Sequence, residues 1–202
     1  MGFYWTLPVP WAGFTDLPAD LDVAARASRT IRYQREVIRR YARENRYELV
    51  HEEAFLEIQP DRGSELILEP LTKVEAICRR YDAVLLFVDF SLVQGWRSHH
   101  LMRRWFDRSE IRMEKIYPDE IVIDGERFDP HAHFEAWRER QRRWTEGKAE
   151  RKVKILQRIR ELRDSGFDYA AIAGFLNSDG IRSSTGKPWN SDNVRKVLHS
   201  RD

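Results

Sequence analysis

The sequence predicts an α/β protein with a mainly parallel sheet, followed by a connecting helix and a C-terminal helix-turn-helix unit. Three observations predict this. Strand-like and helix-like runs alternate over residues 1–129, which is typical of a layered α/β fold. In the strand expected over residues 82–88, the run after Asp82 is continuously apolar, as in a parallel strand that is covered on both faces. From Pro130 the pattern becomes polar and helical. We therefore expect an α/β domain over residues 1–129, a connecting helix over 130–165 and the helix-turn-helix unit over 166–202.

The elements of the α/β part follow from hydrophobic periodicity and from turn residues. Pro8 and Pro10 close the first strand, where a missing backbone donor is tolerated. The pair Asp124-Gly125 between apolar runs predicts a two-residue hairpin turn over residues 121–128. The other expected elements are a strand over 3–9, a loop over 11–25, a helix over 30–45, a strand over 47–55, a loop over 59–64, a helix over 71–80, a helix over 96–107 and a strand over 111–117.

The connecting region carries apolar residues at helical spacing. The first stretch has Phe134, Trp137 and Trp144 with Arg138 and Gln141 between them, and the second has Val153, Leu156, Ile159 and Leu162. Gly147 lies between the two stretches, so either one long helix or two joined helices fit the pattern.

Composition bounds the class of protein. A chain of 202 residues can build a real core in one or two domains. The single Cys78 excludes a disulfide framework and indicates a reduced thiol. No apolar run is long enough to span a bilayer, and the N-terminus lacks the pattern of a signal peptide, so we expect a cytoplasmic protein. From Arg151 on, the chain has 11 Lys and Arg against 6 Asp and Glu, whereas the rest has 24 against 27. A polyanion should therefore be attracted to the C-terminal part.

The C-terminal stretch, residues 167–200, reads as two short helices around a tight connection. The first is expected over about residues 169–177, with one face formed by Tyr169, Ile172, Phe175 and Leu176. Asn177 and Gly180 are expected at its exit, because both tolerate the left-handed conformation. The second helix starts after Asn190 or Ser191, either of which can cap it. Its apolar face consists of Val194, Val197 and Leu198.

The other face of the last helix is polar and basic, with Asp192, Asn193, Arg195, Lys196 and His199. Such a helix, packed on a preceding one, suits insertion into a DNA major groove. A small helical subdomain with a solvated basic face fits the spacing equally well.

The run IAGFLNSDGIRSSTGKPWNSDNVRKVL resembles the C-terminal DNA-binding helices of the serine recombinases. Their typical run is a helix ending L-N, then G-I, a basic loop, G-K-x-W, Ser, and a helix ending V-R-x-x-L. The matching residues are Leu176, Asn177, Gly180, Ile181, Gly186, Lys187, Trp189, Ser191, Val194, Arg195 and Leu198.

The resemblance implies double-stranded DNA as the partner. The DNA contacts that we predict are Arg182, Ser183, Lys187, Ser191, Asp192, Asn193, Arg195 and Lys196. Trp189 is expected to pack under the turn, so that Lys187 reaches backbone phosphate. Asn193 and Lys196 lie in the first turns of the last helix, where base edges are read.

The α/β part resembles the recombinase catalytic domain more weakly. The phrase TIRYQREVIRRYARENRYELV is similar to the family's S-x-x-x-Q-R-x-x-I-x-x-Y-A-x-x-N-x-Y-x-[LV]. The matching residues are Gln34, Arg35, Ile38, Tyr41, Ala42, Asn45 and Tyr47. In this family a serine attacks a DNA phosphodiester to form a 5′-phosphoserine link, while arginines neutralise the phosphate.

The residues needed for that chemistry are missing at the matching positions. The family's R-V-S after the first strand falls on residues 6–8, where Thr6 replaces the arginine and Pro8 the serine. Its [DS]-R-L-[SG]-R falls on residues 90–95, with neither arginine. Ser28 as a displaced nucleophile is the weaker alternative, because it is more simply a helix cap, as is Thr30. Arg97 can replace one arginine only if the local alignment shifts.

No cofactor or metal is expected. The histidine pairs His99-His100 and His131/His133 lack partners at a recognised ligand spacing, and surface or capping roles explain them better. The chain has no Gly-rich nucleotide loop.

These observations predict a sequence-specific DNA-binding protein of serine-recombinase type, without strand exchange, acting in regulation or on a mobile element. In the family the connecting helix dimerises, which implies a homodimer or a higher homo-oligomer associated with the nucleoid. The alternative for that helix is plain amphipathic packing on its own domain. The alternatives for function are an active recombinase with a rearranged site and a structural or interaction protein with weak nucleic-acid contact.

Overall fold

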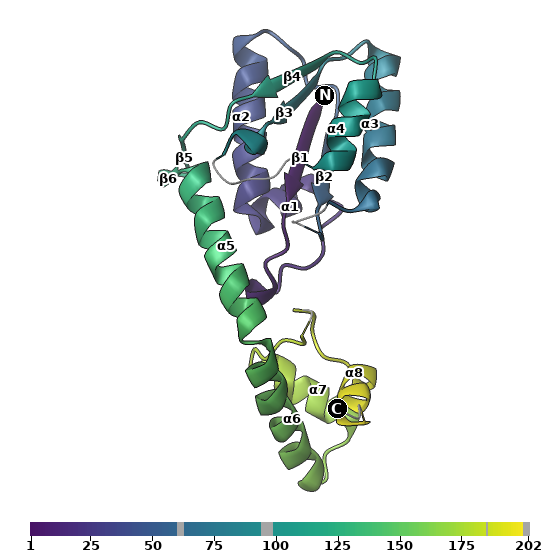
Figure 1. Ribbon diagram of the computed structural model, residues 1–202, viewed down its shortest axis with the longest axis vertical. Helices are drawn as coiled ribbons and strands as arrows, with labels where there is room; N and C mark the ends of the chain where they lie inside the picture. The colour runs from purple at the N-terminus through teal and green to yellow at the C-terminus, as the bar shows by residue number, and fades with distance from the viewer. Residues whose placement is uncertain (60–62, 94–98, 185, 200–202) are drawn as a thin grey trace. The chain divides into compact units, whose positions relative to one another are not determined.

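The structure is a computed structural model, which describes residues 1–59, 63–93, 99–184 and 186–199 (Figure 1). The chain divides into two compact units. The first consists of Met1–Pro8 and Asp16–Glu135, and the second of Val9–Thr15 and Ala136–Asp202. The short N-terminal segment Val9–Thr15 is therefore grouped with the C-terminal helices, far away in the sequence.

A parallel sheet forms the centre of the first unit. In the part of the chain that the structure describes, the strands β1 (Gly2–Thr6), β2 (Glu52–Leu56), β3 (Leu85–Val88) and β4 (Met113–Ile116) pair in the order β2-β1-β3-β4. All neighbouring pairs are parallel. The expected α/β class with a mainly parallel sheet is thus confirmed. The second strand begins later than expected, because the chain leaves the preceding helix through Arg46 in a left-handed conformation and stays irregular up to His51.

Helices cover both faces of this sheet (Figure 1). The sequence of helices is α1 (Leu21–Ala27), α2 (Arg29–Glu44), α3 (Leu68–Tyr81) and α4 (His100–Arg108). The expected loop over residues 11–25 is wrong at its end, because α1 begins at Leu21. The Asp20 side chain accepts a hydrogen bond from the Val23 N–H over 2.9 Å, so this aspartate caps a helix rather than marking a loop. The predicted start of the helix at residue 96 lies outside the described residues.

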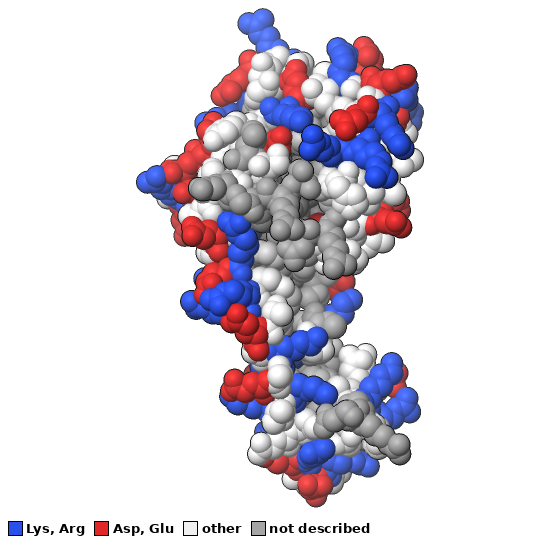
Figure 2. Space-filling model, in the orientation of Figure 1, with Lys and Arg blue, Asp and Glu red and all other residues white. Residues whose placement is uncertain are grey.

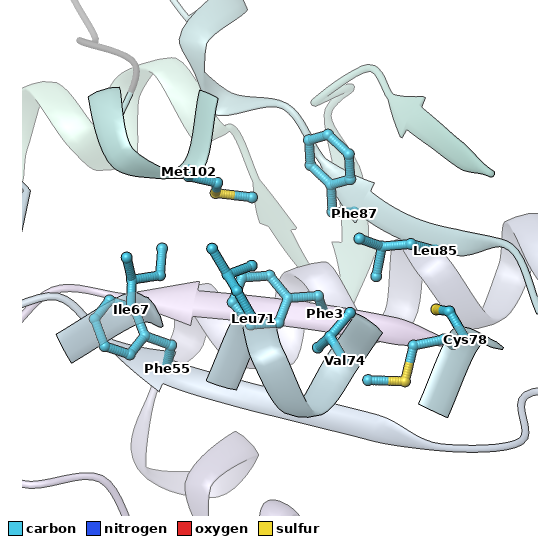
Figure 3. Packing of buried hydrophobic residues seen from close by; sticks show 10 residues of the cluster. Phe3, Phe55, Ile67, Leu71, Val74, Cys78, Leu85, Phe87 and Met102 are labelled. Carbon is cyan, nitrogen blue, oxygen red and sulfur yellow. The ribbon is translucent and has the colours of Figure 1, made fainter. Parts of the chain in front are cut away.

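One face of the sheet packs against α3 and α4. Phe3 and Phe55 lie there with Leu85 and Phe87 of β3 (Figure 3). The residues of α3 and α4 on this core are Leu71, Val74, Cys78 and Met102. Since successive residues of a strand point to opposite faces, Leu86 and Val88 lie on the α2 side. All four β3 residues are buried, as the apolar run predicted.

The hairpin at Asp124-Gly125 is confirmed. Strands β5 (Ile121–Ile123) and β6 (Glu126–Phe128) pair antiparallel and form a sheet of their own. Asp124 and Gly125 both have positive φ, 52° and 80°, as a two-residue turn of type I′ requires.

The connecting region is two helices. α5 (Pro130–Glu146) and α6 (Lys148–Asp164) are separated at Gly147, so the interpretation of one long helix is wrong. The C-terminal helices α7 (Tyr169–Ser178) and α8 (Ser191–His199) follow. Among the described residues, every helix is too short or too polar to cross a bilayer.

Candidate nucleic-acid interface

Three helices of the second unit pack around one apolar cluster. Its buried members are Ile159 and Leu162 of α6, Ile172, Ala173 and Leu176 of α7, Trp189, and Val194 of α8. Val197 and Leu198 pack against it. The predicted apolar face of the last helix and the burial of Trp189, which is 6% exposed, are both confirmed. Val153, at the other end of the α6 stripe, is 65% exposed.

The face predicted for the first of the two short helices is only partly correct. Tyr169, Ile172 and Leu176 contribute to the cluster, but Phe175 is 40% exposed and Ala173 takes its place. Residues 169, 172, 173 and 176 follow the i, i+3, i+4, i+7 stripe of a helix, and Phe175 lies beside that stripe. Phe175 instead stacks edge-on against Phe167, with ring centroids 4.9 Å apart.

Asn177 joins the two short helices. It was predicted at the helix exit, but it lies inside α7 and its side chain reaches across the connection. The Asn177 Nδ2 donates to the Trp189 carbonyl oxygen over 2.9 Å, and the Trp189 N–H donates to Asn177 Oδ1 over 2.8 Å. The exit is made by Gly180, whose φ is 70°, as predicted. The paired hydrogen bonds fix the backbone just before α8 begins.

Asn190, rather than Ser191, caps α8. The Asn193 N–H donates to Asn190 Oδ1 over 2.8 Å. Asp192 and Arg195 form an exposed ion pair of 3.2 Å on the outer side of the helix. Lys and Arg side chains of this unit reach the surface interspersed with Asp and Glu (Figure 2).

The predicted DNA contacts differ in their exposure to solvent and fall into three groups. The exposed ones are Lys187, Ser191, Asp192, Arg195 and Lys196. Arg182 and Asn193 are half-buried. Ser183 is only 7% exposed, and its N–H donates to the Lys187 carbonyl oxygen over 3.0 Å within a tight turn.

The segment Val9–Thr15 lies against this turn, which sequence reasoning missed. A Cβ added at Gly186 would meet the Cα and Cβ of Pro10 at 2.8 Å. A Cβ added at Gly13 would meet the guanidinium of Arg182 at 3.4–3.5 Å. Nothing in the local sequence pattern signals contacts over so long a separation.

In the first unit, Thr6 and Ser28 are neighbours in the folded structure. Thr6 is 2% exposed, and its Oγ1 lies 2.8 Å from the Oγ of Ser28. Ser28 is 6% exposed and caps α2 by accepting the Ile31 N–H over 3.3 Å. The capping interpretation of Ser28 is confirmed, whereas Thr30 is no cap and its Oγ1 lies 3.1 Å from His133 Nε2. Gln94, Gly95 and Arg97 lie outside the described residues.

A buried carboxylate near the end of β2 was also missed. Glu57 is 3% exposed and lies 2.6 Å from His99 Nε2. Its oxygens also accept the N–H groups of Gln59 and Ser64 over 2.6 and 3.0 Å. Burial acts to raise the Glu57 pKa, but the hydrogen bonds from His99, Ser64 and Gln59 outweigh it and lower the pKa. His99 also caps α4, so this pair ties that helix to the sheet. Within the described residues, His, Cys, Asp and Glu side chains do not gather in threes that could hold a metal ion.

Comparison with known proteins adds one finding. Residues 150–201, which lie in the second unit and include α7 and α8, match the family model described as Recombinase. This match supports a relationship to the recombinase family and indicates a DNA function connected with recombination. Neither a curated protein nor a solved structure matches the chain.

Proposed function

We propose that this protein binds specific double-stranded DNA through its C-terminal unit, with α7 and α8 acting as a helix-turn-helix and α8 as the reader. The proposal rests on the way in which α8 is held on the apolar cluster. The Asn177–Trp189 hydrogen bonds and the buried Val194 hold α8 on the cluster, which leaves Arg195 and Lys196 on its outer side. These helices lie inside the segment that matches the recombinase family.

The residues divide into phosphate anchors and base readers. Lys187 is exposed in the turn before α8, where a cation can reach the DNA backbone. Asn193 and Lys196 lie in the first turns of α8. An asparagine can form two hydrogen bonds with adenine, and a lysine can donate to guanine acceptors.

In this proposal the protein does not exchange strands. Pro8 cannot act as a nucleophile, and the hydroxyl of Ser28 is engaged with Thr6 and with the start of α2. The first unit then serves oligomerisation or partner contact, and the connecting helices support a homodimer. Mapping the bound DNA across a genome will show whether the target is a promoter or a mobile element.

The test compares Lys187→Ala with Asn193→Ala on a specific site and on random DNA at several salt concentrations. Lys187→Ala should weaken binding to both DNAs and flatten the salt slope by about one, because one phosphate contact is lost. Asn193→Ala should cost about 1–3 kcal/mol on the specific site and little on random DNA.

Lys154→Ala is the matched control. It removes the same charge from an exposed side chain that pairs with Glu150 on α6, outside the turn and α8. Its salt slope should equal that of the wild type. If Asn193→Ala lowers both affinities equally, α8 is not the reader and the proposal is wrong.

A further inference from the structure

The segment Val9–Thr15, which we call the clip, is a small closed loop. The Val9 N–H donates to the Phe14 carbonyl oxygen over 2.7 Å, and the Phe14 N–H donates to that of Val9 over 3.2 Å. The Gly13 N–H donates to the Pro10 carbonyl oxygen over 3.1 Å. These hydrogen bonds fix the shape of the clip, which belongs to the second unit.

The clip touches the turn before α8 at Gly186. This glycine is buried and has a φ of 81°, and an added Cβ would lie 2.8 Å from Pro10 Cα and 2.9 Å from Thr15 Cγ2. Real Cβ atoms do not approach other heavy atoms this closely. A glycine is needed here both for the backbone conformation and for the approach of the clip.

The clip touches the same turn a second time at Arg182. The Nε, Cζ and Nη2 of Arg182 lie 3.4–3.5 Å from the place of a Cβ on Gly13, so the guanidinium rests against the Gly13 backbone. Arg182 itself is half-buried beside the clip. Trp11 adds a contact with Trp137 of α5, with ring centroids 6.3 Å apart.

We propose that the clip is a positioning element of the DNA-binding unit, which holds the turn residues 182–184 and 186–187 so that Arg182 contacts a DNA phosphate. The proposal rests on the proposed function. A guanidinium resting on a fixed backbone loses less rotamer entropy on binding than a free one, and this improves the affinity for phosphate. The turn leads directly into Trp189 and α8, so holding it also orients Lys187.

The experiment compares Gly186→Ala with Gly180→Ala in the full-length protein. Both glycines have positive φ, 81° and 70°, so both substitutions carry the same backbone strain. An added Cβ meets Pro10 and Thr15 at Gly186, but nothing within 4 Å at Gly180. The difference between the two variants therefore isolates contact with the clip. Pro10→Gly alters the same contact on the clip, because it removes the Pro10 side chain. This variant replaces Gly186→Ala if Gly186→Ala does not fold.

Two measurements are made on each variant: hydrogen–deuterium exchange of residues 9–15, and affinity for DNA at several salt concentrations. Gly186→Ala should speed exchange in the clip and reduce the salt slope by about one, as Arg182→Ala should. Combining it with Arg182→Ala should cause no further reduction, because both remove the same phosphate contact. Gly180→Ala should leave the exchange of the clip unchanged, because its added Cβ meets no atom within 4 Å.

Unchanged exchange in Gly186→Ala would show that the clip is not docked on the turn. Faster exchange with an unchanged salt slope, or with tighter DNA binding, would show that the clip does not position Arg182. Absence of DNA binding by the wild type would instead refute the proposed function, since the exchange measurement is made without DNA.

Discussion

At the scale of single residues, polar side chains fix the backbone at the ends of helices and strands. Asn177 fixes the backbone of Trp189 before α8, and Ser28 caps α2. Glu57 accepts two backbone N–H groups and the ring N–H of His99. Ser28 and Glu57 are buried, and a buried polar group is costly to leave without a partner, so both side chains stabilise the local backbone.

Glu57 should make the first unit sensitive to acid. Its folded pKa is lowered from the ordinary value of a glutamate, so its ionised form stabilises the protein above the pH range in which an unfolded glutamate titrates. This contribution is lost as the pH falls through the folded pKa. Glu57→Gln should lower the free energy of unfolding at neutral pH by about 1–3 kcal/mol and flatten its fall on acidification.

Urea unfolding over a series of pH values measures both effects. Glu150→Gln is the control, because the Glu150 pKa is also lowered, by Lys154, but the side chain is exposed and its pair is screened by solvent. An acid dependence in Glu57→Gln equal to that of the wild type would contradict the role of this carboxylate.

At the scale of elements, the burial of a strand indicates how much it contributes to the stability of the fold. β3 is buried along its whole length and pairs with β1 on one side and β4 on the other. By contrast, Val122 of β5 is 68% exposed. A strand covered on both faces tolerates few polar residues, whereas a hairpin at the surface tolerates many.

Leu86→Asp should therefore unfold the first unit. Leu86 is 1% exposed, and an unpaired carboxylate there should cost several kcal/mol. Loss of soluble, cooperatively unfolding protein is the expected result, measured by expression and thermal unfolding. Val122→Asp, the matched change on an exposed strand, should leave folding nearly unchanged. A stable Leu86→Asp protein would mean that β3 is not the central strand.

At the scale of the whole molecule, the proposed function includes no DNA cleavage, because Pro8 carries no nucleophile where the resemblance to the serine recombinases places the serine. Incubation with supercoiled DNA that the protein binds should therefore give no covalent adduct, as judged by mass spectrometry of trapped complexes. Ser28 is where a phosphoserine would be sought first. Ser28→Ala should keep DNA binding and lower stability by about 1 kcal/mol, through loss of the cap. An adduct that disappears in Ser28→Ala would establish an active recombinase.

Features that depend on neighbours along the chain could be predicted from the sequence. The parallel sheet followed from the apolar run of β3, and the hairpin from Asp124-Gly125. The end of α7 followed from Gly180, and the inner face of α8 from the spacing of Val194, Val197 and Leu198. Periodicity and turn chemistry act over a few residues, so a pattern of residue types is enough to predict them.

Contacts between segments that are distant in the sequence became visible only in the three-dimensional structure. The hydrogen bonds of Asn177 to Trp189, the pairing of Glu57 with His99, and the approach of Pro10 to Gly186 join residues that no local pattern relates. A solvent-exposed turn would also favour a glycine at position 186. The residue type therefore does not reveal that the backbone of Pro10 lies against it. The physical reason is that tertiary packing depends on many residues from distant parts of the chain at once. Conformational propensity, by contrast, depends on one residue and its neighbours in the sequence.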